Sequence, residues 1–98
     1  MRAPKQPAVY ILASRRYGAL YIGVTSNLRR RVWEHKQGSP GTHTERYGVQ
    51  KLVYYELCAD MLAAIRREKQ LKKWKRSWKI RLLAQFNPAW RDLYSDIL

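Results

Sequence analysis

The chain has 98 residues, of which 46% are hydrophobic, and its 20 Lys and Arg against 7 Asp and Glu give a formal net charge of +13. This length allows one domain with a modest core, and the apolar fraction excludes a disordered basic tail. No apolar run is long enough for a membrane span or a signal peptide, and Cys58 has no second cysteine to pair with, so we expect a cytoplasmic protein without disulfides.

Two strand-forming stretches lie near the start of the chain. Residues 1–7 contain two prolines and are predicted to form an irregular arm. Residues 8–13 and 20–25 are rich in strand formers, and the polar stretch between them ends at Gly18. This pattern predicts a β-hairpin.

The loop of this hairpin decides which side chains share a face. If residues 14 and 19 pair across a four-residue loop, Tyr10 lies opposite Gly23, which leaves open space beside the Tyr10 ring. In the same register Tyr10 and Tyr21 point to one face, whereas a shift by one residue would place them on opposite faces.

A short helix is predicted after the hairpin. Residues 25–27 offer N-cap side chains, residues 28–37 are predicted to be helical, and Gly38 ends the helix. Residues 38–49 are rich in Gly, Pro and Thr and are predicted to form a loop.

The second half of the chain is predicted to add one strand and further helices. Residues 52–57 form the strand, and Asp60 caps a helical stretch that begins at residue 61, bends or breaks around 74–77 and ends near residue 85. Residues 90–98 form a short helix or turn that packs a Trp and a Leu back onto the domain. The order β-β-α-β-α-α predicts an α+β fold with a three-stranded antiparallel sheet flanked by helices.

Two polar residues interrupt the apolar stripe of the first helix. Leu28 and Val32 define the side that faces the core, since helical residues advance by about 100° each. Arg31 lies beside this stripe and His35 within it, one turn apart. Taken alone, each has an ordinary explanation: an Arg stem often covers apolar surface, and a lone His is more often a helix-face residue than a catalyst.

Glu68 interrupts the apolar stripe of the second helix. The stripe is formed by Met61, Ala64, Ile65 and Leu71. A carboxylate buried among such residues is costly unless a cation meets it. Two explanations stand side by side: an i,i+4 pair with Lys72, worth about 0.2–0.5 kcal/mol on an exposed helix, and a metal-binding carboxylate.

Together these polar residues are the groups that phosphodiester hydrolysis needs. A carboxylate holds a divalent metal, an Arg neutralises charge on the phosphate, and a Tyr or His handles the proton of the attacking water. The net charge predicts a polyanionic partner, because each Lys or Arg that neutralises a phosphate releases a counterion. A membrane-surface helix would need a coherent apolar face opposite the charge, and the many aromatic residues favour nucleic acid.

The same residues resemble the GIY-YIG nuclease superfamily. The run YIGVTSNLRRRVWEH, residues 21–35, is similar to the family pattern YIG-x-T-x-N-L-x-x-R-x-x-x-H, and residues 8–10 stand where the family has its first triplet. The resemblance covers roughly residues 8–92, between the arm and a C-terminal tail, 93–98. It is closest to small stand-alone bacterial members of the family.

The resemblance implies an α/β sandwich of the GIY-YIG endonuclease fold and a DNA endonuclease with a Mg²⁺ or Mn²⁺ ion on Glu68, its only protein ligand. It also implies that Arg31 contacts the scissile phosphate. Tyr10 is the preferred general base, and His35 assists it or holds the phosphate. Tyr21 is expected to orient water or phosphate through its hydroxyl.

Two positions depart from the family pattern. Ala8 replaces the glycine of the first triplet, which affects backbone packing rather than chemistry. Many family nucleases carry an Asn about a dozen residues after the Glu, and that position falls near Ile80 here. Asn87 lies later in the chain and is interpreted either as a supporting substrate contact or as a residue of the turn that ends the helix.

Basic and aromatic residues outside this group are expected to hold the substrate. The candidates are Arg29, Arg30, Lys72, Lys73 and Trp74. Because one domain leaves no room for a second DNA-reading module, we expect weak sequence specificity unless a homodimer or a partner protein supplies it. The expected substrate is single-stranded or branched DNA, with duplex DNA also open, and the expected state is a monomer or weak homodimer.

Two alternative functions remain at this point. One is a non-catalytic nucleic-acid-binding module of the same fold. The other is a subunit that cuts only with a partner. The presence of Tyr10, Tyr21, Arg31, His35 and Glu68 argues against a module that has lost activity.

Overall fold

A computed structural model describes residues 6–38 and 48–98. Its elements are β1 (Ala8–Ala13), β2 (Leu20–Thr25), α1 (Leu28–Gln37), β3 (Lys51–Leu57), α3 (Met61–Lys73), α4 (Arg76–Phe86) and the 3-10 helix η1 (Leu93–Ile97). The predicted order β-β-α-β-α-α is confirmed. Within the described part of the chain, no helix combines the length and the apolar character that crossing a bilayer requires.

The three strands form one antiparallel sheet in the order β2-β1-β3, with β1 in the centre. The backbone N–H of Ser14 donates to the carbonyl of Ala19 (3.0 Å), and Tyr10 pairs with Gly23. The predicted hairpin register is therefore confirmed. The third strand begins at Lys51, one residue before the predicted start.

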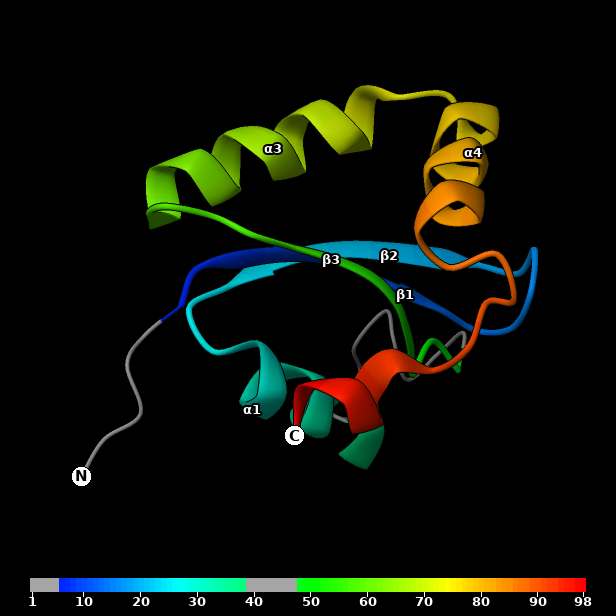
Figure 1. Ribbon diagram of the computed structural model, residues 1–98, viewed down its shortest axis with the longest axis horizontal. Coiled ribbons are helices and arrows are strands. Elements are labelled where there is room, and N and C mark those ends of the chain that lie inside the picture. Colours follow the sequence, from blue (N-terminus) through cyan, green and yellow to red (C-terminus); the bar gives the residue numbers. More distant parts are fainter. Residues whose placement is uncertain (1–5, 39–47) are drawn as a thin grey trace.

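Helices cover both faces of the sheet (Figure 1). The helices α3 and α4 lie on one face, and α1 and η1 lie on the other. Because β1 is the central strand and helices cover both faces of the sheet, all six of its residues are buried. The alternating side chains of the strands consequently enter two separate cores.

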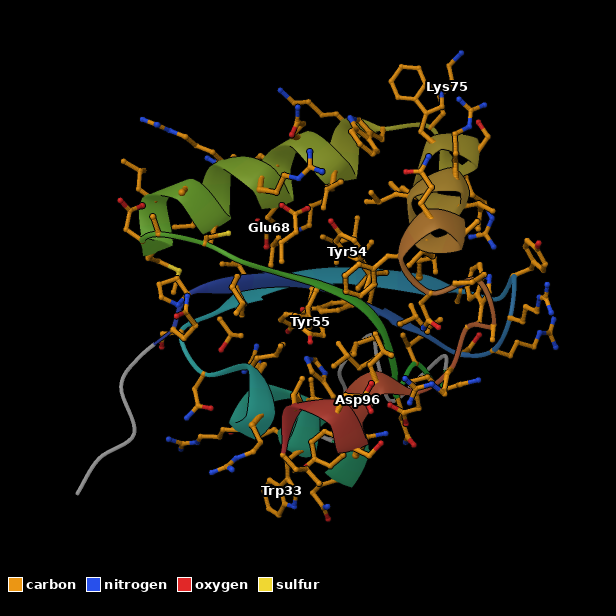
Figure 2. The ribbon with its side chains drawn as sticks, in the orientation of Figure 1. Trp33, Tyr54, Tyr55, Glu68, Lys75 and Asp96 are labelled. Atoms are coloured by element: carbon orange, nitrogen blue, oxygen red, sulfur yellow. The ribbon has the colours of Figure 1, made fainter. Side chains whose placement is uncertain are left out.

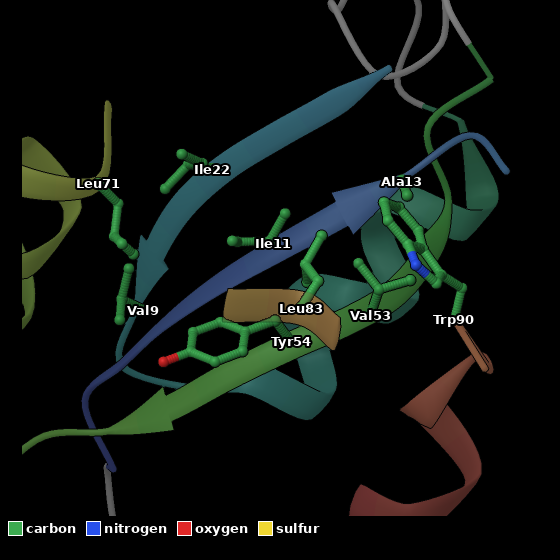
Figure 3. Packing of buried hydrophobic residues seen from close by; sticks show 9 residues of the cluster. All are labelled: Val9, Ile11, Ala13, Ile22, Val53, Tyr54, Leu71, Leu83 and Trp90. Atoms are coloured by element: carbon green, nitrogen blue, oxygen red, sulfur yellow. The ribbon is translucent and has the colours of Figure 1, made fainter. Parts of the chain in front are cut away.

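The first core lies between the sheet and the α3–α4 layer and is drawn in Figure 3. It consists of Val9, Ile11, Ala13, Ile22, Val53, Tyr54, Leu71, Leu83 and Trp90. The second core lies towards α1 and η1. It consists of Ala8, Tyr10, Leu12, Leu28, Val32, Val49, Leu52 and Leu93. Tyr10 thus belongs to the layer that α1 covers.

The helix boundaries follow the predicted capping side chains. Asn27 Oδ1 accepts from the backbone N–H of Arg30 at the start of α1, and Asp60 Oδ1 accepts from that of Ala63 at the start of α3. The second helical stretch breaks at residues 74–75, which have extended backbone, within the predicted interval. This break turns α4 away from the axis of α3 and makes an exposed corner (Figure 1).

The C-terminal segment folds back onto the domain, as predicted. Trp90 and Leu93 are buried. Asp92 accepts from the backbone N–H of Leu52 (3.2 Å) and forms an ion pair with Lys36 (2.5 Å). These contacts tie η1 to β3 and to the end of α1, so they help to hold α1 in place.

Candidate active site

The ring of Tyr10 lies across Gly23. A Cβ atom added to this glycine would stand 2.4 Å from the Tyr10 hydroxyl oxygen and 2.5 Å from the ring carbon that bears it. Such distances are impossible for a real side chain. The open space expected beside the ring is therefore filled by the ring itself, and a residue with a Cβ at position 23 would force the Tyr10 ring to move.

Three rings meet above this position. The centroids of Tyr10 and Tyr21 lie 6.4 Å apart, those of Tyr10 and His35 5.8 Å, and those of Tyr21 and His35 5.3 Å. The Tyr10 hydroxyl and His35 Nε2 are hydrogen-bonded at 2.9 Å. The prediction that Tyr10 and Tyr21 share one face is confirmed, and His35 of α1 joins them.

Arg31 brings a positive charge to the same group. Its guanidinium hydrogen-bonds the Tyr10 hydroxyl, and its Nη1 lies 3.7 Å from the Glu34 carboxylate on the same helix. About half of the Arg31 side chain, 47%, is exposed. One end of this guanidinium is thus held while part of it faces solvent.

Glu68 reaches the group from the other layer. Figure 2 shows it on the side of α3 that faces the sheet. Its side chain is 16% exposed, and Lys72 Nζ lies 3.6 Å from its Oε2, so the predicted i,i+4 contact forms. The carboxylate is also near enough for its negative charge to raise the pKa of Tyr10. Glu68 therefore has Lys72 as a local cation and also exerts an electrostatic effect on Tyr10.

Burial controls the protonation of Tyr10 and His35. Desolvation raises the pKa of Tyr10 to about 12, and this effect outweighs the opposing hydrogen bond from Arg31. Desolvation lowers the pKa of His35, and the positive charge of Arg31 lowers it further. Near neutral pH both side chains are consequently uncharged, because each pKa moves away from the charged form.

The donor set fits a hydrated divalent cation and not a closed metal site. In residues 6–38 and 48–98 there is no group of three or more His, Cys, Asp or Glu placed to hold a metal ion. Glu68 supplies a single, mostly buried carboxylate. Mg²⁺ fits such an arrangement, since it usually keeps several waters and binds through one or two carboxylates and substrate phosphates.

The other predicted contacts fall in two places. Arg29 and Arg30 are exposed on α1, where Arg30 Nε lies 3.9 Å from Glu34. Lys73 and Trp74 stand at the end of α3, beside the corner with α4. The structure does not bring these two sets together on one helix or one layer.

Asn87 fits the second of its two interpretations, a residue of the turn that ends the helix. Only 6% of this residue is exposed. Its Nδ2 donates to the carbonyls of Val53 and Arg91, and its Oδ1 accepts from the backbone N–H of Arg91. Asn87 therefore holds the turn after α4, and its amide has no surface to offer a substrate.

One feature of the corner was not predicted from the sequence. A pocket of about 210 Å³ is lined by Trp74, Trp78, Arg81, Leu82 and Gln85. The spacing of Trp74 and Trp78, four residues apart within a basic run, was the available signal. Arg81, Leu82 and Gln85 follow Trp78 by three, four and seven residues and so share its face of α4, but the break at 74–75 hides the position of Trp74 from the pattern.

Comparisons with known proteins cover most of the chain. The family model described as the GIY-YIG catalytic domain matches residues 6–81. A UPF0213 protein of Clostridium perfringens is 37% identical over 76 residues, which cover 78% of this chain and 81% of that protein. A UPF0213 protein of Natronomonas pharaonis is 38% identical over 65 residues, which cover 66% of this chain and 76% of that protein.

A solved structure is also similar. The solution NMR structure of a UPF0213 protein from Bacillus halodurans matches with a TM-score of 0.53 and 28% identity, covering 85% of this chain and 88% of that one. The segment that the family model matches contains every member of the group from Tyr10 to Glu68.

Proposed function

The chain belongs to the family of the GIY-YIG catalytic domain, a nuclease family, and on this premise we propose that it is a divalent-metal-dependent endonuclease that hydrolyses phosphodiester bonds in DNA. One observation carries the proposal. The negative charge of Glu68, on α3, acts on Tyr10, whose hydroxyl contacts His35 and Arg31 of α1. A carboxylate, a guanidinium and a neutral imidazole that all act on Tyr10 are the groups that the reaction requires.

Glu68 is the residue that would hold the metal ion. A bound Mg²⁺ or Mn²⁺ would polarise the phosphoryl oxygens as a Lewis acid. Lys72 Nζ lies 3.6 Å from Glu68 Oε2 and orients the carboxylate. The i,i+4 pair and the metal-binding role are therefore compatible, since Lys72 contacts one oxygen of the carboxylate.

Arg31 stabilises the charge that develops on the phosphate. Its guanidinium is anchored at Tyr10 and stays partly exposed, so it has donors left for a phosphate oxygen. Tyr21 lies against the rings of Tyr10 and His35 and orients water or phosphate through its hydroxyl. Fixed donors of this kind need no reorganisation when charge forms in the transition state.

Two observations support His35 rather than Tyr10 as the group that takes the proton. Tyr10 is fully buried and its pKa is raised to about 12, so its anion forms with difficulty near neutral pH. His35 is partly exposed and its pKa is lowered, so it is ready to accept a proton. Tyr10 then acts by holding His35 and Arg31. This proposal replaces the expectation that Tyr10 is itself the general base.

The proposed substrate is DNA read mainly through its backbone. The exposed cations on α1 and near the end of α3 are suited to phosphate contacts, which position a substrate without specifying its sequence. We therefore expect weak sequence specificity, with single-stranded or branched DNA preferred. A homodimer or a partner protein would be the source of any stronger specificity.

The proposal is tested by incubating the purified chain with labelled single-stranded, duplex and forked DNA and with RNA, in Mg²⁺, Mn²⁺ or EDTA. We expect cleavage of DNA that EDTA abolishes. Cleavage that EDTA leaves unchanged would contradict the metal mechanism. Binding to all four substrates without cleavage would favour the non-catalytic module or a subunit that requires a partner.

A further inference from the structure

The corner between α3 and α4, made of Trp74, Trp78, Arg81, Leu82 and Gln85, is separate from the residues that carry the chemistry. We propose that this α3–α4 corner is a stacking site for an unpaired nucleobase, with Trp78 as the ring on which the base lies. The inference deepens the proposed function, on which it rests, because it assigns the preference for single-stranded or branched DNA to one surface.

The corner is built on a rigid base. The guanidinium of Arg67 lies 5.1 Å from the centroid of the Trp74 ring, and Arg67 Nε donates to Glu56 Oε2 (2.8 Å). Trp74 also packs against the first core. Glu56 of β3 therefore holds the Arg67 guanidinium in place over the Trp74 ring, and this contact positions the ring.

Trp78 presents its ring to solvent above that base. Its centroid lies 6.0 Å from that of Trp74, with the two planes at 78°. Trp78 nevertheless keeps 47% of its surface exposed. An indole held edge-on by a neighbour and open on its outer side has the geometry of a stacking platform.

The surroundings of the corner favour nucleic acid over a protein partner. Residues 72–81 contain six Lys and Arg and no acid, namely Lys72, Lys73, Lys75, Arg76, Lys79 and Arg81. Arg76 is engaged with the carbonyls of Tyr17 and Gly18, while Lys75 stands at the outer edge of the corner (Figure 2). Protein interface cores are depleted of Lys, whereas aromatic rings among cations are typical of single-strand binding.

The pocket beside the rings suits one base. Its volume is about 210 Å³, and Arg81 and Gln85 add hydrogen-bonding side chains to its aromatic and apolar walls. In a duplex the bases are stacked on each other and do not present their faces. The corner therefore discriminates by strand state and not by sequence, because every base has a face that can stack.

The test compares Trp78→Ala with Trp33→Ala as the matched control. Trp33 is also exposed (51%) and lies on α1, on the opposite side of the molecule (Figure 2). Affinities for labelled single-stranded and duplex oligonucleotides are measured in EDTA, so that no cleavage occurs. We expect Trp78→Ala to weaken single-strand binding by roughly 5- to 100-fold, the usual effect of losing one stacked base, with little change for duplex.

The control variants make each outcome decisive. Trp33→Ala should bind both oligonucleotides as the parent does, and Trp78→Phe should recover part of the single-strand affinity. If Trp78→Ala lost equal affinity for single-stranded and duplex DNA, or lost no affinity at all, the stacking site would be overturned. In the second case the corner would be a contact surface for a protein partner instead. Because binding is measured without a metal ion, a failure to cleave DNA would contradict the proposed function and leave this inference standing.

Discussion

The group around Tyr10 and the α3–α4 corner are two polar regions built on opposite principles. Around Tyr10 a few side chains from two layers converge, and each has a defined partner. At the corner many cations lie on the surface around two tryptophans. On the proposed function, most of the net charge of +13 would hold a polyanion, whereas the chemistry would depend on the few side chains that converge at Tyr10.

The largest difference between the regions should appear with arginine substitutions. Arg31→Ala removes the guanidinium that contacts Tyr10, whereas Arg29→Ala removes an exposed cation on the same helix. We expect Arg31→Ala to lower the cleavage rate by roughly 10²–10³-fold and Arg29→Ala to affect mainly binding. If both variants lost the same cleavage rate at saturating DNA, Arg31 would only contact the DNA backbone, as Arg29 is expected to do.

The pH dependence of cleavage tests the role of His35. Its pKa is lowered from 6.5, so it stays neutral, and able to accept a proton, until the pH falls below that value. We expect the rate to decline only below pH 6.5 and His35→Ala to lose that decline together with most of the rate. If the cleavage rate of His35→Ala still declined at low pH as it does in the parent, the proton transfer would belong to another group.

The close packing of Tyr10 on Gly23 predicts a loss of both stability and activity in Gly23→Ala. The new Cβ would stand 2.4 Å from the Tyr10 hydroxyl, so the ring must move. Forced overpacking of this kind typically costs about 1–3 kcal/mol of unfolding free energy. Thermal unfolding of the double variant Tyr10→Ala/Gly23→Ala provides the check: the effect of Gly23→Ala should shrink once the ring is gone, and strict additivity would contradict the predicted clash.

The hairpin and the helix starts are predictable from the sequence because their causes are local. A four-residue loop sets the pairing of Tyr10 with Gly23, and capping side chains act within one turn at Asn27 and Asp60. Glu68 is also visible in the sequence, since a carboxylate among apolar neighbours breaks the helical pattern. These features involve residues that are close along the chain or related by simple periodicity.

What the sequence does not predict depends on packing between layers. The burial of Tyr10, which argues against it as the base, arises because α1 closes over its face of the sheet. The turn role of Asn87 was one of two interpretations of the sequence, but its hydrogen bond to the carbonyl of Val53 comes from another element and has no local signal. The pocket at the α3–α4 corner likewise depends on the angle between two helices.

The smallest expected effects come from single cations at the corner. Lys73→Gln should leave the cleavage rate at saturating DNA unchanged. It should also reduce the slope of the logarithm of the binding constant against the logarithm of the salt concentration by up to about one. Arg91→Gln is the matched control, because the Arg91 guanidinium is already paired with Asp96 at 2.7 Å. An unchanged slope for Lys73→Gln would remove Lys73 from the substrate path.

DNA cleavage by Glu68→Gln in Mg²⁺, with Asp60→Asn as control on the same helix, tests whether Glu68 holds the metal ion. Asp60 acts as a helix cap, a role that Asn also fills, so this control removes an acid without changing the fold. We predict that Glu68→Gln binds DNA as the parent does and cuts at least roughly 10²-fold more slowly, while Asp60→Asn cuts normally. Cleavage by Glu68→Gln at the parental rate would show that Glu68 holds no catalytic metal ion.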